Sequence, residues 1–148
     1  MYDALSIAYY IINYGNHRGM GISNLKLQKI LYFVQANFLV STHDHRPCFS
    51  DRIEAWDFGP VVPNVYHQYK VYGSAIIPPN PNDPLRSFYQ EILEQDKGMI
   101  DIMVDQTASY SASQLVQLTH NQSPWRNAYR PNCNNEISND SILHFFKD

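Results

Sequence analysis

The stretch that decides the fold is Ile22-Ser23-Asn24-Leu25-Lys26-Leu27-Gln28-Lys29-Ile30-Leu31-Tyr32-Phe33-Val34-Gln35-Ala36-Asn37-Phe38-Leu39, the longest uninterrupted helical pattern in the chain. Apolar residues recur in it every three or four positions, on one face of a helix: Leu27, Leu31, Val34 and Phe38. Ser23 is a good N-cap, because its hydroxyl can accept from the free N–H groups of the first turn. The stretch predicts a helix roughly 25 Å long. We expect it to be the central packing element, with Lys26 and Lys29 facing outward.

The composition is that of a globular protein with little net charge. The chain has 148 residues, of which 44% are hydrophobic and 17% are charged, and its formal net charge is −3. A chain of this length buries about two-thirds of its unfolded surface, so its core needs no metal ion or disulfide. The charge provides no broad basic surface for nucleic acid, and no run of about eighteen apolar residues indicates a membrane span. We therefore expect one domain over residues 1–148, with no direct nucleic-acid partner and no membrane partner.

The N-terminus and the cysteines indicate a cytoplasmic protein. No basic segment precedes the first apolar stretch, and Asn13, Tyr14 and Asn16 interrupt that stretch, so a signal peptide is not expected. Cys48 and Cys133 lie far apart, and two cysteines do not make a disulfide framework. A reducing compartment is the simpler interpretation.

The remaining pattern predicts a mainly α fold (α+β), a bundle of six to seven helices around the central helix with one short β-hairpin. Capping residues and apolar spacing place the other helices over 2–14, 63–72 and 111–120, and starting at 83–84, 123 and 138. Gly15 is expected to end the first helix and Gly98 to break the one that starts at 83–84. Residues 132–136 are expected to form a polar loop.

The hairpin is expected where the residues alternate between apolar and polar. Residues 47–49 and 53–57 are its predicted strands, and 50–52 form the turn between them. Residues 58–63 contain two prolines and a glycine. Because proline lacks a backbone donor, we expect this segment to be irregular.

Two features of the composition leave alternatives open. The chain has 11 tyrosines, a residue enriched at protein interfaces but also common at the half-buried edge of a small core. Residues 83–105 carry six acidic and two basic residues, so this segment has a net charge of −4. We favour a solvated helical face for these acids. The alternative is an acidic docking surface for a basic partner.

The sequence does not assemble a catalytic or metal site. His43, His45 and Cys48 lie close together, but no second ligand cluster accompanies them. Nucleophile and phosphate-binding motifs are absent. His120 is the most suggestive titratable residue, although a histidine that closes a helix by binding backbone carbonyls explains it better. We expect no enzyme, metal or cofactor, and keep catalysis by His120 and Glu54 as the alternative.

Four segments resemble the motifs of the Panacea-domain family of SocA-like antitoxins. Residues 22–33 are similar to the opening motif, 53–66 to the second, 118–120 with 123–125 to the third, and 137–139 with 145–146 to the closing segment. They follow the family order and cover nearly the whole chain, although the proline-rich loop and the acidic segment depart from the family. The resemblance marks these family-motif residues, most of which we expect to be structural: Leu25, Leu27, Gln28, Lys29, Tyr32, Trp56, Gly59, Pro60, Thr119, His120 and Trp125.

The resemblance implies an antitoxin of a bacterial or phage toxin–antitoxin system, which neutralises a cognate protein toxin by direct binding. Two alternatives stay open: an adaptor that delivers the toxin to the ClpXP protease, and a phage protein that binds a host defence factor. Each of these three interpretations allows the chain to form a homo- or hetero-oligomer. We expect the toxin to contact tyrosines and charges that are exposed around the turn of the second motif: Tyr66, Tyr69, Lys70 and Tyr72.

Overall fold

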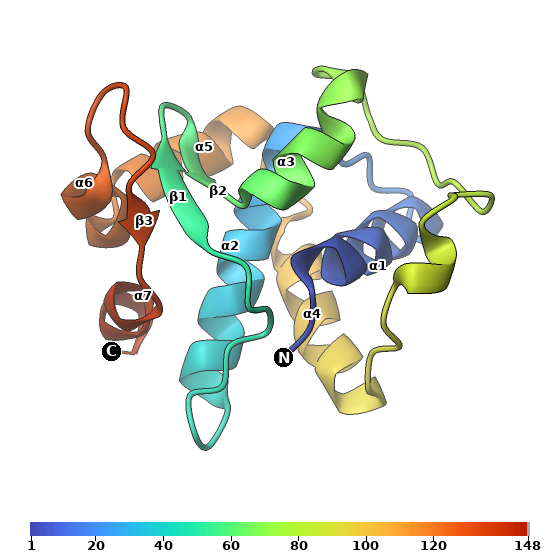
Figure 1. Ribbon diagram of the computed structural model, residues 1–148, viewed down its shortest axis with the longest axis horizontal. Helices are drawn as coiled ribbons and strands as arrows, with labels where there is room; N and C mark the ends of the chain where they lie inside the picture. Colours follow the sequence, from blue (N-terminus) through green and yellow to red (C-terminus); the bar gives the residue numbers. More distant parts are fainter. Residues whose placement is uncertain (148) are drawn as a thin grey trace.

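Helix α2 (Asn24–Ser41) is the centre of the structure, a computed structural model that describes residues 1–147. Asp148, the last residue of the expected domain, lies outside the described residues. The hydroxyl of Ser23 caps the helix by accepting from the backbone N–H of Lys26 at 3.3 Å, as expected. Figure 1 shows α2 in the middle of the molecule, with α1 and α4 on one side and the hairpin and α7 on the other. The core therefore forms around this helix.

The other elements agree with a mainly α fold. Within residues 1–147 the remaining α-helices are α1 (Ala4–His17), α3 (Pro63–Tyr69), α4 (Glu94–Thr107), α5 (Ala112–His120), α6 (Ser123–Ala128) and α7 (Asn139–Phe146). Two 3₁₀ turns are η1 (Lys70–Tyr72) and η2 (Arg86–Phe88). The strands β1 (Ile53–Trp56), β2 (Gly59–Val61) and β3 (Glu136–Ile137) form an antiparallel sheet in the order β2-β1-β3. The expected fold class is confirmed, and β3 is a strand that lies partly in the expected polar loop.

Helix α2 is buried on nearly all of its faces, including both of its lysines. Lys29 is 0% exposed, and its Nζ donates to the carbonyl oxygen of Pro60 at 3.1 Å. Lys26 is also buried, and its Nζ lies 3.4 Å from the carbonyl oxygen of Ala108. The expectation that these lysines face outward is wrong. Their aliphatic stems pack among neighbouring elements while each ammonium group reaches a backbone carbonyl.

The hairpin is formed by β1 and β2, whereas residues 47–49 were expected to pair with 53–57. Residues 47–49 instead run beside the N-terminus, where the N–H of Tyr2 donates to the carbonyl of Cys48 at 2.9 Å. The side-chain oxygen of Gln35 on α2 also accepts from the N–H of Cys48. These long-range bonds occupy the backbone that the predicted hairpin would have used.

Strand β2 exists although it contains Pro60, because of the register of the hairpin. Pro60 lies opposite Ala55, whose N–H donates away from β2, to Asn135 at 2.9 Å. This pair therefore makes no hydrogen bond across the hairpin, and proline loses no donor there. The carbonyl of Pro60 faces away from β1, toward the buried Lys29. The prediction that residues 58–63 are irregular is wrong for this reason.

Gly15 does not end α1, which continues to His17. A Cβ on Gly15 would come within 2.4 Å of the Cδ1 of Ile22, so glycine serves here for close approach. Gly19, with φ +76°, follows the helix end instead.

Helix α4 starts at Glu94 and not at 83–84, and Gly98 lies inside it without a break. Residues 89–93 run along the N-terminal segment, where the N–H of Gln90 donates to the hydroxyl of Ser6 at 2.9 Å. The N–H of Leu93 likewise donates to the hydroxyl of Tyr2 at 3.2 Å. These tertiary bonds take the N–H groups that a longer helix would have needed.

Tyrosine hydroxyls on the N-terminal segment and α1 donate to aspartates of α4. The pairs of this Tyr–Asp ladder are Tyr2–Asp96 (2.6 Å), Tyr10–Asp101 (2.6 Å) and Tyr14–Asp105 (3.0 Å). Asp96 is buried and also pairs with Arg46 at 3.0 Å. Half of the acids in the acidic segment therefore hold α4 against α1, and the expectation of a wholly solvated face is wrong for them.

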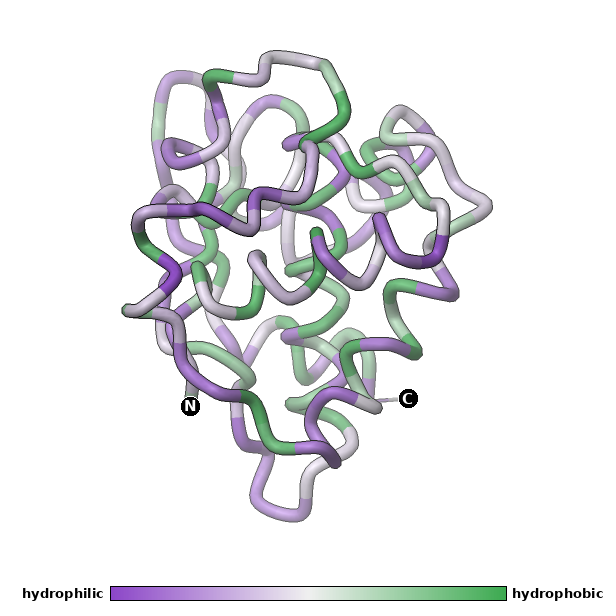
Figure 2. Tube along the Cα trace, turned by 90° about the vertical axis from the view of Figure 1, so that its right-hand side faces the viewer, coloured by the Kyte–Doolittle hydropathy of each residue, from purple (hydrophilic) through white to green (hydrophobic). Residues whose placement is uncertain are grey.

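The helix starts near the C-terminus follow the expected capping chemistry. Ser111 and Gln114 form a capping box at α5, and Ser138 caps α7. At α6 the N-cap is Gln122, one residue before the expected Ser123. Figure 2 shows hydrophobic and hydrophilic residues interleaved along the chain. Over the described residues, no helix combines the length and the apolar character that a membrane crossing requires.

Candidate functional site

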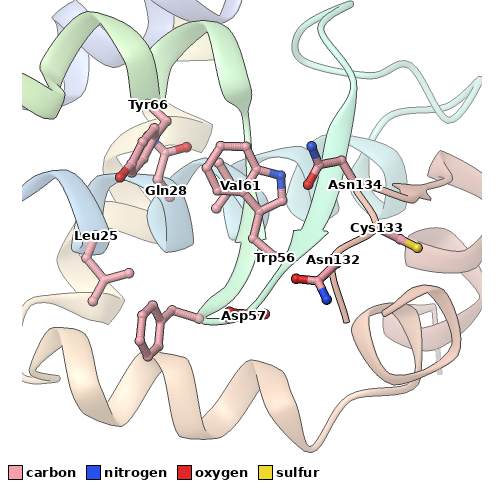
Figure 3. Close-up of a pocket in the computed structure, with 10 residues that line it drawn as sticks. Leu25, Gln28, Trp56, Asp57, Val61, Tyr66, Asn132, Cys133 and Asn134 are labelled. Atoms are coloured by element: carbon pink, nitrogen blue, oxygen red, sulfur yellow. The ribbon is translucent and has the colours of Figure 1, made fainter. Parts of the chain in front are cut away.

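The tip of the β-hairpin, residues Asp57 and Phe58 between β1 and β2, lies where three of the motif segments meet. In Figure 3 the central helix passes behind the hairpin and α5 runs along its tip, while α3 follows β2 directly. Helix α6 reaches the hairpin through Trp125. Asp57 and Phe58 form a two-residue turn that closes on the pair Trp56–Gly59. The site is therefore a projecting turn on a sheet that is supported from several sides.

Gly59 is required at the base of this turn for two reasons. Its φ of +106° lies in a region that other residues rarely adopt. A Cβ at this position would also lie 2.7 Å from the Cε of Lys29 and 2.9 Å from the Oγ1 of Thr119. Motif residues from α2 and α5 thus contact the hairpin directly through the space that glycine leaves.

Side chains from α5 and α6 hold the backbone of the tip. The indole N–H of Trp125 donates to the carbonyl of Trp56 at 2.8 Å. Nε2 of His120 lies 3.0 Å from the carbonyl of Asp57, a contact that calls for the tautomer protonated at Nε2. The hydroxyl of Tyr129 donates to the carboxylate of Asp57. The chain is thus held at Trp56, the last residue of β1, and at Asp57, the first residue of the turn.

The residues considered for catalysis are occupied by structural bonds. The rings of His120, Trp125 and Tyr129 form a stack, with centroids 4.0 Å and then 4.6 Å apart. Glu54 accepts from the indole of Trp56 at 3.0 Å and pairs with Arg52 at 3.0 Å. The side chains of His120 and Glu54 thus both support the hairpin, and no hydrogen bond joins these two side chains.

A pocket of about 290 Å³ opens beside the hairpin tip. Its lining comes from α2, the hairpin, α3 and the loop before β3: Leu25, Gln28, Trp56, Asp57, Phe58, Val61, Tyr66, Asn132, Cys133 and Asn134. In Figure 3 the indole of Trp56 stands in the middle of this set, with Leu25 and Tyr66 to one side and the two asparagines to the other. The pocket combines aromatic and aliphatic walls with amides and one carboxylate.

Phe58 makes this site unusual, because it is 66% exposed on a turn whose backbone is held in place. Trp56 beside it packs edge-on against Tyr66, with centroids 5.0 Å apart. An exposed phenylalanine on a rigid turn next to an aromatic pocket costs little entropy to bury against a partner. The arrangement is suited to recognition by contact.

The expected toxin-contact residues do not share one surface. Tyr66 lines the hairpin pocket and Lys70 is exposed, but Tyr69 is only 7% exposed, so the expectation that it faces solvent is wrong. Burial raises the pKa of Tyr69 to about 12. Tyr69 stacks on the half-buried Tyr72 at 6.5 Å, and both line a different pocket, next to the proline-rich loop.

Other motif residues connect α2 to the segments around the site. The side-chain oxygen of Gln28 accepts from the N–H of Val62 at 2.9 Å, immediately after β2. The hydroxyl of the fully buried Tyr32 donates to the side chain of Gln122 at 2.8 Å, before α6. Leu25 lines the pocket itself. Gln28 and Tyr32 thus connect α2 to the ends of the hairpin and of α6 by hydrogen bonds.

Lys29 is the least ordinary of these supports. Its ammonium group is buried with one hydrogen-bond acceptor, the carbonyl of Pro60. Burial lowers the pKa of Lys29 to about 7, because a charged amine loses the hydration that stabilises it. Near neutral pH this lysine is only partly charged.

Sequence reasoning missed Phe58 and Tyr129 as parts of the site. Phe58 carried a signal, because a large apolar residue directly before a glycine, at the end of an alternating strand, occupies the tip of a turn. Tyr129 lies 72 residues from Asp57 and carried no local signal. Across the described residues, no group of three or more histidine, cysteine or acidic side chains could hold a metal ion.

Comparison with known proteins identifies relatives of the chain. A family model described as "Antitoxin SocA-like, Panacea domain" matches residues 27–126. The chain is also similar to Antitoxin SocA of Caulobacter vibrioides (strain NA1000 / CB15N), with 33% identity over 137 residues, covering 83% of this chain and 68% of that protein. No solved structure gives a significant match.

Proposed function

Because the chain belongs to the Panacea-domain family of SocA-like antitoxins, we propose that it neutralises a cognate protein toxin by binding that toxin directly. The proposal assigns no catalytic step to the chain. The toxin is a protein that the hairpin end of the molecule contacts, with Phe58, Trp56 and Tyr66 as the central aromatic side chains.

The exposed Phe58 on a rigid turn is the observation that carries this proposal. Two motif segments that are far apart in the sequence hold the turn of the second motif, through Lys29 from the opening motif and His120 and Trp125 from the third. These bonds hold the backbone on either side of Phe58, while the side chain of Phe58 stays exposed. A hydrophobic side chain on such a preorganised turn loses less conformational entropy when a partner binds it.

Two of the residues expected from the sequence remain candidates at the edge of this surface. Tyr66 lines the pocket and packs on Trp56, and Lys70 is exposed one turn further along the chain. Tyr72 is half-buried beside the proline-rich loop and is a candidate only if the partner extends there. Tyr69 is set aside because it is buried.

Co-expression with the protein encoded by the adjacent gene tests the proposal. The neighbouring protein alone is expected to stop growth, and co-expression of this chain is expected to restore growth and to yield a complex that co-purifies. The same rescue in a strain without ClpXP separates binding from delivery to the protease. Continued toxicity with both proteins present and no complex would reject direct neutralisation.

A further inference from the structure

The hairpin pocket has the chemistry of a cation-binding site. Three of its lining residues are aromatic, Trp56, Phe58 and Tyr66, and their ring faces are negative relative to their edges. Asp57 is its one acidic residue. Among the described residues, the lining contains no lysine, arginine or histidine. Aromatic faces together with a carboxylate are what recognise a guanidinium or ammonium group.

We propose that this pocket takes an arginine side chain of the partner. The proposal rests on the proposed function, since it names the chemistry by which the toxin would occupy the site. Arginine fits better than lysine, because a planar guanidinium can stack on an aromatic ring while its N–H groups reach a carboxylate.

The polar groups of the pocket are placed to leave capacity for such a guest. One carboxylate oxygen of Asp57 accepts from Tyr129, while no ion pair to Asp57 is present within residues 1–147. Asn132 and Asn134, on the far side of Trp56 in Figure 3, add amide oxygens to the lining. A guanidinium has five donors, so a single carboxylate together with neighbouring amide oxygens suits it.

The walls are also held in position before any partner arrives. Trp56 is fixed at its indole by Glu54, at its carbonyl by Trp125, and at its ring by Tyr66. A preformed wall reduces the entropy lost on binding. Because Trp56 lines the pocket, the resonance of its indole N–H reports on binding there.

Nuclear magnetic resonance of the whole ¹⁵N-labelled chain tests this with a probe that needs no toxin. N-acetyl-arginine amide is titrated in, and N-acetyl-citrulline amide, which has the same shape without the charge, is the control. We expect a saturable shift of the Trp56 indole N–H with the arginine probe, in the millimolar range, and at least about tenfold weaker binding of the citrulline probe. Amides of α4 serve as an internal reference and are expected not to move.

Asp57→Asn is the matched variant, because asparagine keeps an acceptor for Tyr129 and removes the charge. It is expected to weaken the arginine probe about tenfold while the rest of the spectrum is unchanged. The proposal is overturned by the absence of a saturable shift, by equal binding of the citrulline probe, or by unchanged binding to Asp57→Asn. Equal binding of N-acetyl-lysine amide overturns the choice of arginine.

The outcome is separable from that of the proposed function. Growth rescue without any response to the arginine probe rejects the arginine pocket and leaves direct neutralisation standing. A saturable arginine response without rescue or complex formation supports the pocket and rejects neutralisation of that toxin.

Discussion

The hairpin end and the α1–α4 side of the molecule use the same residue types in opposite ways. In the Tyr–Asp ladder, the hydroxyls of Tyr2, Tyr10 and Tyr14 are bonded to carboxylates within the molecule. At the hairpin end, stacked rings hold a turn so that Phe58 stays 66% exposed. Aromatic residues alone therefore do not locate a binding surface. What distinguishes the hairpin end is the exposed side chain of Phe58 beside an aromatic pocket.

The clearest contrast between acids of the two regions is that between Asp96 and Asp57. Asp96 is buried with two internal partners, whereas Asp57 has one hydrogen bond to Tyr129 and no ion pair in the described chain. The ladder is expected to contribute stability without binding, and the hairpin end is expected to contribute binding. Variants in the two regions should therefore separate these properties.

Gly59→Ala is expected to have the largest effect on stability. The Cβ of the alanine would lie 2.7 Å from the Cε of Lys29. The alanine would also have to adopt a φ of +106°. Overpacking and backbone strain together predict a loss of about 2–4 kcal/mol of unfolding free energy, measured by denaturant titration. Gly19→Ala is the control, since Gly19 also has a positive φ but nothing lies within 4 Å of its Cβ position. It should cost about 1 kcal/mol, and equal losses at the two sites would contradict the close approach.

Lys29→Met is expected to change how stability depends on pH. The folded-state pKa of Lys29 is lowered to about 7 by burial, from an ordinary value near 10.4. Between these values the unfolded chain holds the proton and the folded chain does not, so raising the pH stabilises the folded state. From pH 7 to about 7.8, below the ordinary cysteine pKa of about 8.5, the wild-type free energy should rise by up to about 1.4 kcal/mol per pH unit.

The methionine variant should lose that slope, because it cannot titrate. Lys70→Met, at an exposed lysine, should keep it. Denaturant titrations at several pH values measure both. A wild-type free energy that is flat or falls between pH 7 and about 7.8 would show that Lys29 stays charged in the folded protein.

Tyr10→Phe is expected to have the smallest effect on stability of these variants and no effect on the affinity for the toxin. It removes the hydroxyl that donates to Asp101 at 2.6 Å and leaves the half-buried ring in place. The loss of one such hydrogen bond predicts about 1 kcal/mol in denaturant unfolding. Loss of toxin binding at unchanged stability would mean that the ladder belongs to the interface.

Local chemistry was enough to predict much of this fold. Ser23, Ser111 and Ser138 cap helices through bonds that depend only on residues three positions away. The apolar spacing of residues 22–39 correctly predicted that α2 is the central helix. The motif resemblance also selected Trp56, Gly59 and Trp125, which meet at the hairpin.

The errors came from bonds between residues distant in sequence. Gln35 and Tyr2 take the backbone of residues 47–49 out of the expected hairpin. Ser6 and Tyr2 hold residues 89–93 extended and delay the start of α4. The pairing register that tolerates Pro60 and buries Lys29 likewise depends on the assembled sheet. Such bonds leave no periodic signal in the chain.

The most direct test compares two exposed phenylalanines on different parts of the surface. Phe58, on the hairpin tip, is 66% exposed, and Phe88, in η2, is 77% exposed. Calorimetric titration of the purified toxin is expected to show at least about 30-fold weaker binding to Phe58→Ala, the effect of a hot-spot residue, and unchanged binding to Phe88→Ala. Both variants should keep the wild-type melting temperature. Wild-type affinity of Phe58→Ala, or an equal loss in both variants, would contradict the assignment of the hairpin end as the binding surface.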